Sequence, residues 1–183
     1  MNFQSQKSIK FSALRDLVGA LINENYVLAV DQAHNFVFKK EAFEKYAFWN
    51  EDHYTRNCIA HNESFELILL CWEAGQKTAN HCHNGQECWV KVISGEFEED
   101  MYVLNENTNK LTYTETKHVS QHEVTSVDDR TVFHTLQNIS KNRAMSLHLY
   151  MKPIDQCRYV DEESKELKTA VMSYHSVNGE KCS

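Results

Sequence analysis

Short β-prone segments follow one another closely from about residue 54 onward, and they constrain the fold more than any other feature of this sequence. They are rich in Val, Ile, Thr and aromatic residues, with polar turn residues between them. Segment 65–73 (FELILLCWE) is almost continuously apolar, which predicts a strand buried on both faces. The close spacing of the segments favours an antiparallel β-barrel or a double-sheet jelly roll. The other predicted strands are 53–60, 88–93, 96–104, 111–119, 123–127, 130–138, 144–151 and 166–176.

The residues before this region have a helical period instead. An apolar stripe with i, i+3, i+4, i+7 spacing consists of Leu14, Leu17, Val18 and Leu21. Further short helices are predicted at about 25–34 and 40–48. A chain of 183 residues is long enough for one domain with a sizeable core. We therefore expect a single domain over 1–183, with a helical cap over 1–50 and the β region over 51–183.

Composition excludes several classes of function. Apolar residues make up 42% and charged residues 25%, as in globular proteins. A net charge of −7 argues against nucleic-acid and anionic-membrane partners. No apolar run approaches the roughly 20 residues of a membrane span, and the first residues lack an apolar signal core. We expect a cytoplasmic monomer whose six cysteines are mostly thiols.

Segment 75–95 (GQKTANHCHNGQECWVKVISG) carries the strongest candidate for chemistry. In an extended segment, His81 and His83 share one face and can offer two imidazoles to one metal ion. The turn signal Asn84–Gly85 follows directly, and a β-prone run begins at Cys88. The segment therefore predicts a β-hairpin with two metal ligands at its mouth.

His134 is the candidate for a third ligand. It shares one face of a predicted strand with Val132 and Leu136, so it points into the interior. A lone histidine there would be interpreted as a buried side chain satisfied by a hydrogen bond, but the His-x-His pair upstream favours a ligand. Three neutral imidazoles without a carboxylate suit Zn²⁺ hydrolysis, or Fe²⁺ chemistry with a substrate and O₂.

Two further polar sets occur at strand spacing. Ser146, His148 and Tyr150 share one face and could form a hydrogen-bonded relay, although such a face can simply meet water. The opposite face of that strand consists of Met145, Leu147, Leu149 and Met151. Tyr54 and Arg56 also share a face, and an arginine in a pocket can bind a carboxylate with two parallel hydrogen bonds. The alternative is a solvated arginine.

These motifs together resemble a known family. The pattern Gly75-x5-His81-x-His83-x4-Cys88-x6-Gly95 resembles the first motif of the cupin superfamily, and His134-x3-Asn138 resembles the end of the second. Within cupins the chain is similar to the cysteine dioxygenases, which convert cysteine to cysteine sulfinic acid. The similarity rests on Tyr54-Thr-Arg56-Asn, Cys71-Trp72, His81-x-His83-x4-Cys88, Ser146-Leu-His148-Leu-Tyr150, Asp155-x-Cys157 and Val171-Met172-x-x-His175-Ser176.

The resemblance implies a mainly β, cupin-type antiparallel β-barrel (double-stranded β-helix) with an N-terminal helical cap. It also implies an Fe²⁺ enzyme that uses L-cysteine and O₂, with a place in cysteine catabolism and taurine biosynthesis. Carried over by position, the iron ligands fall on His81, His83 and His134, the carboxylate-binding pair on Arg56 and Tyr54, and the relay on Ser146, His148 and Tyr150. A thioether between Cys88 and Tyr150 is implied as a protein-derived cofactor.

Other activities and some departures from the family pattern stay open. A dioxygenase of 3-mercaptopropionate is expected to have glutamine in place of Arg56. Glu87 follows His83 at a spacing where other cupins place a carboxylate ligand, so a manganese site acting on oxalate is a further alternative, as is a non-catalytic cupin module. Cys157 matches a cysteine at the pocket mouth of the family, whereas Cys182 has no assigned role. The family's Ser-Pro-Pro run, with its cis bond, is replaced by residues 151–153 (Met-Lys-Pro).

Overall fold

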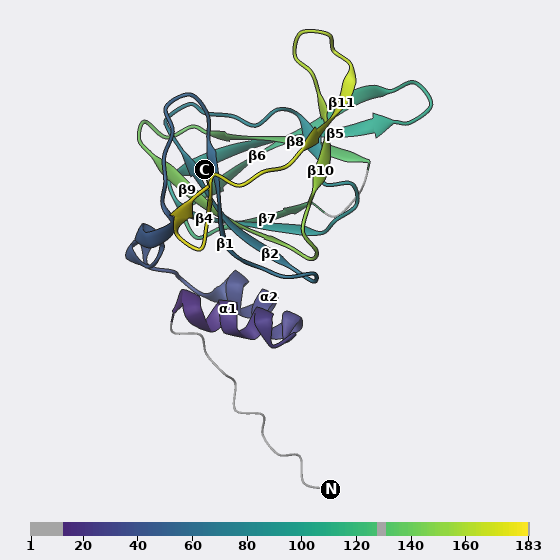
Figure 1. Ribbon diagram of the computed structural model, residues 1–183. Coiled ribbons are helices and arrows are strands. Elements are labelled where there is room, and N and C mark those ends of the chain that lie inside the picture. Colours follow the sequence, from purple (N-terminus) through teal and green to yellow (C-terminus); the bar gives the residue numbers. More distant parts are fainter. Residues whose placement is uncertain (1–12, 128–130, 183) are drawn as a thin grey trace, which may run out of the picture.

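The computed structural model describes residues 13–127 and 131–182 and consists of two β-sheets with helices packed outside one of them (Figure 1). The helical elements are α1 (Leu14–Ile22), α2 (Tyr26–Asn35) and the 3₁₀ helix η1 (Lys40–Tyr46). All three lie where the sequence predicts helices, although the third is a 3₁₀ helix. The change to strands comes at Thr55, close to the predicted position.

The strands form one seven-stranded and one six-stranded sheet. The seven-stranded sheet has the order β13-β12-β1-β2-β9-β4-β7, and the six-stranded sheet has the order β11-β10-β3-β8-β5-β6. The strands are β1 (Thr55–His61), β2 (Glu66–Trp72), β3 (His81–Cys82), β4 (Cys88–Ser94), β5 (Glu96–Asn105), β6 (Lys110–Ser120), β7 (Val124–Val127), β8 (Val132–Asn138), β9 (Ala144–Tyr150), β10 (Gln156–Val160), β11 (Leu167–Val171), β12 (Ser176–Val177) and β13 (Glu180–Lys181).

This is the mainly β, cupin-type architecture that the sequence predicts, with one difference. Neighbouring strands pair antiparallel, except for a short parallel pairing of β1 with β12. The two sheets face each other as a double-sheet structure, and no ladder among the described residues joins them into a closed barrel. Several segments far apart in sequence therefore meet between the sheets.

Strand β2 separates two hydrophobic clusters, which explains its continuous apolar sequence. All seven of its residues are buried. Leu67 and Leu69 pack on the helix side, in a cluster that also contains Leu17 of α1. Ile68 and Leu70 point the other way, into the cluster between the two sheets. Because side chains alternate along a strand, β2 is buried on both faces, as predicted.

Helix α1 closes the outer face of the seven-stranded sheet. Leu17 and Leu21 of its apolar stripe are completely buried, and burial of each such side chain contributes about 1.5–3 kcal/mol. The helix begins after Ala13, whose N–H donates to the Asp16 carboxylate at 3.0 Å and so satisfies one free donor at the helix start.

The hairpin predicted over residues 75–95 is wrong. The turn itself exists, because Asn84 and Gly85 both have positive φ, at 54° and 80°. However, β3 pairs with β8 and β10 of one sheet, whereas β4 pairs with β7 and β9 of the other. The chain crosses between the sheets at this turn, so the partners of β3 are distant strands and not its neighbour in sequence.

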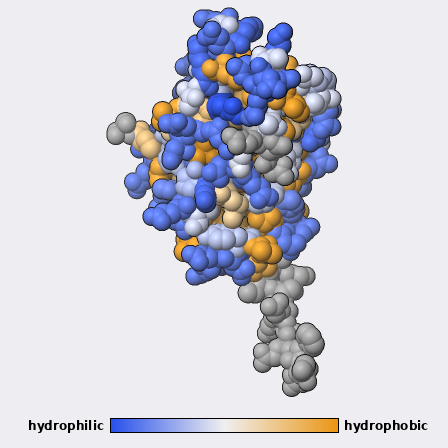
Figure 2. Space-filling view, turned by 90° about the vertical axis from the view of Figure 1, so that its right-hand side faces the viewer, coloured by the Kyte–Doolittle hydropathy of each residue, from blue (hydrophilic) through white to orange (hydrophobic). Residues whose placement is uncertain are grey.

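The surface is mostly polar on the side shown in Figure 2, where hydrophobic residues occur in scattered small groups. The exposed large hydrophobic side chains lie on several different elements, among them Val27, Val37 and Val171. None of the helices in the described part of the chain has the length and apolar character needed to cross a bilayer.

Candidate metal and substrate site

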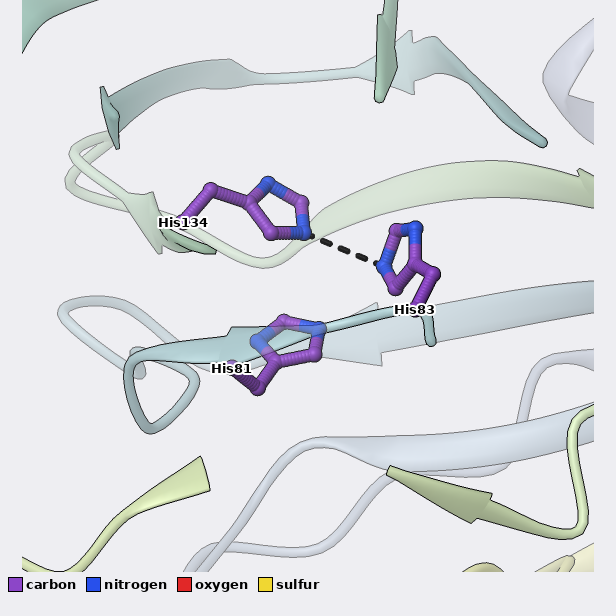
Figure 3. Close-up of side chains that lie close together, drawn as sticks. All are labelled: His81, His83 and His134. Carbon is purple, nitrogen blue, oxygen red and sulfur yellow. Dashed lines mark hydrogen bonds between the residues drawn. The ribbon is translucent and has the colours of Figure 1, made fainter. Parts of the chain in front are cut away.

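His81, His83 and His134 come together at one end of the space between the sheets. Their candidate ligand nitrogens all lie within 4.8 Å of one another. The reason is register: His81 of β3 pairs directly with His134 of β8, and His83 follows β3 on the same side. The Nε2 atoms of His83 and His134 are 3.1 Å apart, and Figure 3 shows all three rings turned toward a common point.

The Nδ1 atoms of two of these rings are held by the protein. His81 Nδ1 lies 3.0 Å from the carbonyl oxygen of Ala79. His134 Nδ1 lies 2.7 Å from a carboxylate oxygen of Glu99, a completely buried residue of β5 whose other oxygen accepts a hydrogen bond from Thr125 at 2.6 Å. Since a carbonyl and a carboxylate only accept, these contacts place the proton on Nδ1 and leave Nε2 free as a ligand.

The electrostatics of the cluster favour neutral imidazoles. Burial and the neighbouring His134 lower the pKa of His81 to about 3. The pKa of His83 is also well below its ordinary value, because of burial and then the two other imidazoles. Burial alone would raise the pKa of Glu99, but hydrogen bonds from His134 and Thr125 outweigh it and lower that pKa. His81 and His83 are therefore neutral and able to act as ligands at neutral pH.

The three side chains fit a divalent transition metal. Nitrogens bound at about 2.0–2.1 Å to one ion lie roughly 3 to 3.5 Å apart, so small side-chain rotations bring these atoms into position. The carboxylate of Glu99 behind a ligating histidine is the usual support for such a site. Glu87 is exposed and lies outside the cluster, so the described residues give no 3-His-1-Glu group.

A cavity of about 230 Å³, here called the central cavity, opens beside the histidines. It brings together residues of both sheets, including both polar sets that the sequence analysis singled out. Its lining consists of Tyr54, Arg56, Leu70, Thr78, Ala79, His81, His83, His134, Leu136, His148, Tyr150, Cys157, Tyr159, Ala170 and Met172.

Arg56 of β1 lines this cavity and has donors without a hydrogen-bond partner. Its Nε and Nη2 atoms are buried, and no described residue accepts a hydrogen bond from either. Burial lowers the pKa of Arg56, but Tyr150, Glu66 and Tyr54 more than offset this, so the guanidinium stays charged. Tyr54 stacks on Trp72 with ring centroids 4.6 Å apart. A buried cation with two open N–H groups is a suitable binding point for a carboxylate.

Ser146, His148 and Tyr150 lie on one face of β9, between the two sheets. The Ser146 hydroxyl is 2.8 Å from His148 Nε2 and accepts a hydrogen bond from the Trp72 indole at 2.9 Å. His148 and Tyr150 stack with ring centroids 6.2 Å apart, without a hydrogen bond between them. The Tyr150 ring lies 5.4 Å from the ring of His83. The relay in this structure is therefore a Trp–Ser–His chain with Tyr150 beside it.

Cys88 faces Tyr150 across the β4–β9 ladder, where the two residues are direct partners. Both are buried, and each side chain contributes to the pKa shift of the other. Burial, reinforced by Cys88, keeps the pKa of the Tyr150 phenol well above its ordinary value. Both groups are therefore protonated at neutral pH and in contact.

The structure also shows the positions of the two remaining cysteines and of the segment at Lys152. Cys157 lines the central cavity, with its thiol 3.3 Å from the sulfur of Met172, whereas Cys182 is exposed. No cis peptide bond occurs among the described residues, and Lys152 has a positive φ of 106°.

Two acidic residues at the site were not predicted from the sequence, Glu99 and Glu66. Glu99 shares its strand face with Phe97, which is fully buried. The position of Glu99 two residues after Phe97 was the sequence signal for its role, since an acidic side chain at an inward-facing strand position needs a partner. Glu66 lies in the segment predicted to be buried on both faces, so the same signal was available, but its contacts with Arg56 and Tyr174 depend on the tertiary fold.

Comparison with known proteins agrees with this geometry. Curated relatives named cysteine dioxygenase type 1 match over most of the chain. The protein of Bos taurus is 28% identical over 164 residues, covering 88% of this chain and 81% of the relative. The protein of Danio rerio is 25% identical over 183 residues, covering 94% and 91%.

A solved structure and a family model complete the comparison. A double-stranded β-helix protein of Klebsiella pneumoniae gives a TM-score of 0.48 at 15% identity, covering 70% of this chain and 94% of that one. The family model described as cysteine dioxygenase type I matches residues 5–163. Because that match spans both histidine motifs, the β9 strand and the helices before them, the chain belongs to the cysteine dioxygenase type I family and is an oxidoreductase.

Proposed function

We propose that this cupin thiol dioxygenase binds Fe²⁺ through His81, His83 and His134 and oxidises L-cysteine with O₂ to cysteine sulfinic acid. The reaction adds both oxygen atoms to the thiol sulfur, so that R–SH and O₂ give R–SO₂H. The observation that carries the proposal is the position of Arg56, a buried arginine with unpaired donors that lines the same cavity as the three imidazoles. Membership of the cysteine dioxygenase type I family supports the same substrate.

The donor set is compatible with iron(II) and with zinc, and membership of the cysteine dioxygenase type I family favours iron. Three neutral imidazoles without a carboxylate leave a divalent ion its full charge and open positions. When bound, iron(II) would supply the reactivity toward O₂ that protein side chains lack and would lower the pKa of a coordinated substrate thiol. Glu99 keeps the His134 ring oriented, with Nε2 toward the common point.

Arg56, which lines the cavity, would bind the substrate carboxylate through parallel N–H donors of its guanidinium, a geometry that suits a carboxylate. Tyr54 lines the cavity beside it, and stacking on Trp72 fixes its ring. Binding at this point orients the thiol of the substrate toward the histidines. Such positioning can supply a large part of a rate enhancement.

Tyr150 would act as a hydrogen-bond donor to the reacting sulfur or oxygen. Its phenol stays protonated because of burial, and its ring lies beside His83. His148, held by Ser146, packs against the Tyr150 ring and limits its movement. Burial lowers the pKa of His148 well below its ordinary value, so this imidazole is neutral and adds no charge near Arg56.

A thioether between Cys88 and Tyr150 would fix the phenol further. Its formation removes one hydrogen from the Cys88 thiol and one from the Tyr150 ring, with O₂ as the acceptor of the two electrons. The direct pairing of the two residues across β4 and β9 supports the proposal. The bond would also remove a competing thiol from the site.

The test is O₂ uptake by iron-loaded protein with L-cysteine, with the product identified by mass spectrometry and 3-mercaptopropionate run alongside. Uptake with cysteine sulfinate as the product is the expected result. A preference for 3-mercaptopropionate, which also carries a carboxylate, would overturn L-cysteine as the substrate of this site. Absence of uptake with both thiols, in protein that holds iron, would overturn the proposed function.

A further inference from the structure

A second carboxylate, that of Glu66, lies beside the arginine of the central cavity. The Glu66 side chain is 1% exposed and Arg56 is 11% exposed, and Glu66 Oε1 is 3.6 Å from Arg56 Nη2. This distance is too long for a hydrogen bond. The two groups are therefore a buried ion pair without a direct hydrogen bond between them.

Other groups hold Glu66 at this distance. The Tyr174 hydroxyl donates to Oε1, and the N–H of Ile154 donates to Oε2 at 3.4 Å. Burial and the bond to Glu66 raise the pKa of Tyr174, so it remains a donor. Each carboxylate oxygen thus accepts a hydrogen bond from another group, and the contact of Glu66 with Arg56 is an ion pair without a hydrogen bond.

In this arrangement Glu66 partly balances the charge of Arg56 but accepts no hydrogen bond from it. Arg56 lines the central cavity whereas Glu66 does not, and Arg56 Nε and Nη2 donate no hydrogen bond to any described residue. A ligand that binds to Arg56 therefore experiences the electrostatic potential of an ion pair and not that of an isolated cation. Two unit charges at this separation interact strongly at the effective dielectric constant of about 20 that suits protein sites.

The effect of Glu66 on substrate preference depends on the free-energy cost of leaving Arg56 without a counter-charge when the substrate has no carboxylate. A buried charge that loses its only partner is strongly unfavourable. With Glu66 present, Arg56 keeps a counter-charge even when the substrate has no carboxylate. Conversely, a substrate carboxylate on Arg56 lies close to a second negative charge, which weakens its binding.

We propose that Glu66, held by Tyr174, is a specificity-determining residue that weakens the preference of the central cavity for carboxylate-bearing thiols. The substrate class then extends to small aminothiols that lack a carboxylate, such as 2-aminoethanethiol. This inference rests on the proposed thiol dioxygenase function and concerns only the end of the cavity at Arg56.

The test compares L-cysteine with 2-aminoethanethiol in iron-loaded protein and in the variant Glu66→Gln. We expect the ratio of kcat/KM for L-cysteine over 2-aminoethanethiol to rise about tenfold, with most of the change in KM. Anaerobic calorimetric titration gives the dissociation constants of both thiols without turnover and should show the same shift. A ratio within twofold of that of the parent protein would overturn the inference.

Tyr174→Phe is a second variant, which we expect to change the kcat/KM ratio in the opposite direction. It frees Oε1 of Glu66, which can then close onto Arg56 Nη2, 3.6 Å away, and compensate it more fully. The same ratio should then fall several-fold, and a rise or no change would contradict the inference even if Glu66→Gln fails to fold.

The control is Glu73→Gln, because Glu73 pairs with Arg143 and does not line the central cavity. It should leave the ratio unchanged, and a shift equal to that of Glu66→Gln would overturn the inference. Absence of turnover of every thiol in the parent protein would refute the proposed function itself. Turnover with an unchanged ratio in the variants would refute only the role of Glu66.

Discussion

The indole N–H of Trp72 donates a hydrogen bond to the hydroxyl of Ser146 at 2.9 Å, and this contact links the core indole to the polar row on β9. Because an indole can only donate, the Ser146 oxygen accepts this bond, and the Ser146 hydrogen is available for His148 Nε2, 2.8 Å away. When Ser146 donates there, His148 carries its proton on Nδ1. Trp72, which does not line the central cavity, thus orders both the relay and the Tyr54 ring stacked on it.

Trp72→Phe should therefore disturb the relay while keeping an aromatic ring in the core. The loss of a buried hydrogen bond is expected to lower the free energy of unfolding by about 1–3 kcal/mol. Nitrogen NMR of the imidazoles should show His148 changing from one tautomer to a mixture. Trp89→Phe is the matched control, because Trp89 packs on the helix side of the sheet, and it should leave the His148 signals unchanged.

Glu99→Gln should weaken metal binding. The amide can still accept a hydrogen bond from His134, but it lacks the charge that increases the basicity of the ring, so affinity should fall about 10- to 100-fold. Competition with a chromophoric chelator measures this without turnover. Glu98→Gln, which changes a residue paired with the exposed His118, is the control. Equal metal affinity in the two variants would contradict a supporting role for Glu99.

Arg56→Ala should reduce kcat/KM for L-cysteine by an amount equivalent to roughly 2–5 kcal/mol, the scale for loss of a buried charge partner. Arg56→Lys should restore little of the loss, because an ammonium group cannot offer two parallel donors. Steady-state O₂ uptake measures both variants. Unchanged kinetics in Arg56→Ala would exclude this residue from substrate binding.

Turnover should produce a fraction of the protein that is lighter by two hydrogen atoms, the signature of a thioether between Cys88 and Tyr150. Intact-mass spectrometry before and after incubation with iron, L-cysteine and O₂ detects it. The fraction should be absent in Cys88→Ser. If the parent protein never shows it under any condition, the two side chains are in contact without forming the bond.

Asp161 should titrate far below an ordinary aspartate. The N–H and hydroxyl of Ser164 donate to its carboxylate, Lys168 lies 3.1 Å away, and its pKa is lowered to about 2. A pKa below the unfolded value of about 3.9 means that the stabilisation is complete above that pH and is lost as the pH falls toward 2. The stability difference between the parent protein and Asp161→Asn should shrink over this range in acid denaturation measurements. A carboxyl NMR titration with a midpoint near 4 would contradict the assignment.

The sequence predicts those parts of the fold that depend on periodicity. The alternation from Met145 to Met151 gives both faces of β9 correctly, because side-chain direction along a strand follows from the backbone. The hairpin was wrong because a turn signal such as Asn84–Gly85 specifies a local reversal, not the sheet that each flanking strand joins. That choice depends on long-range pairing, which no local pattern encodes.

The candidate site shows the same limit. His81 and His134 were expected to meet because both lie on inward strand positions, and they are direct partners across β3 and β8. The pairing of Glu66 with Tyr174 joins residues 108 positions apart and follows from how the end of the chain returns to β1 and β2. Only the assembled structure reveals such a contact.

Strand β9 lies between β2 and β4 and has one face in each hydrophobic cluster. A single-residue insertion near Ala144 would reverse every side chain after it, so that Ser146, His148 and Tyr150 would face the helices and the leucines would face the histidines. Such a change would disrupt the pairing on both sides, because β2 pairs with β9 along its whole length and β4 pairs with it from Met145 to Tyr150. The side-chain register of β9 is therefore constrained as strongly as the identity of its residues. Related proteins should tolerate substitutions in β9 far more readily than insertions or deletions.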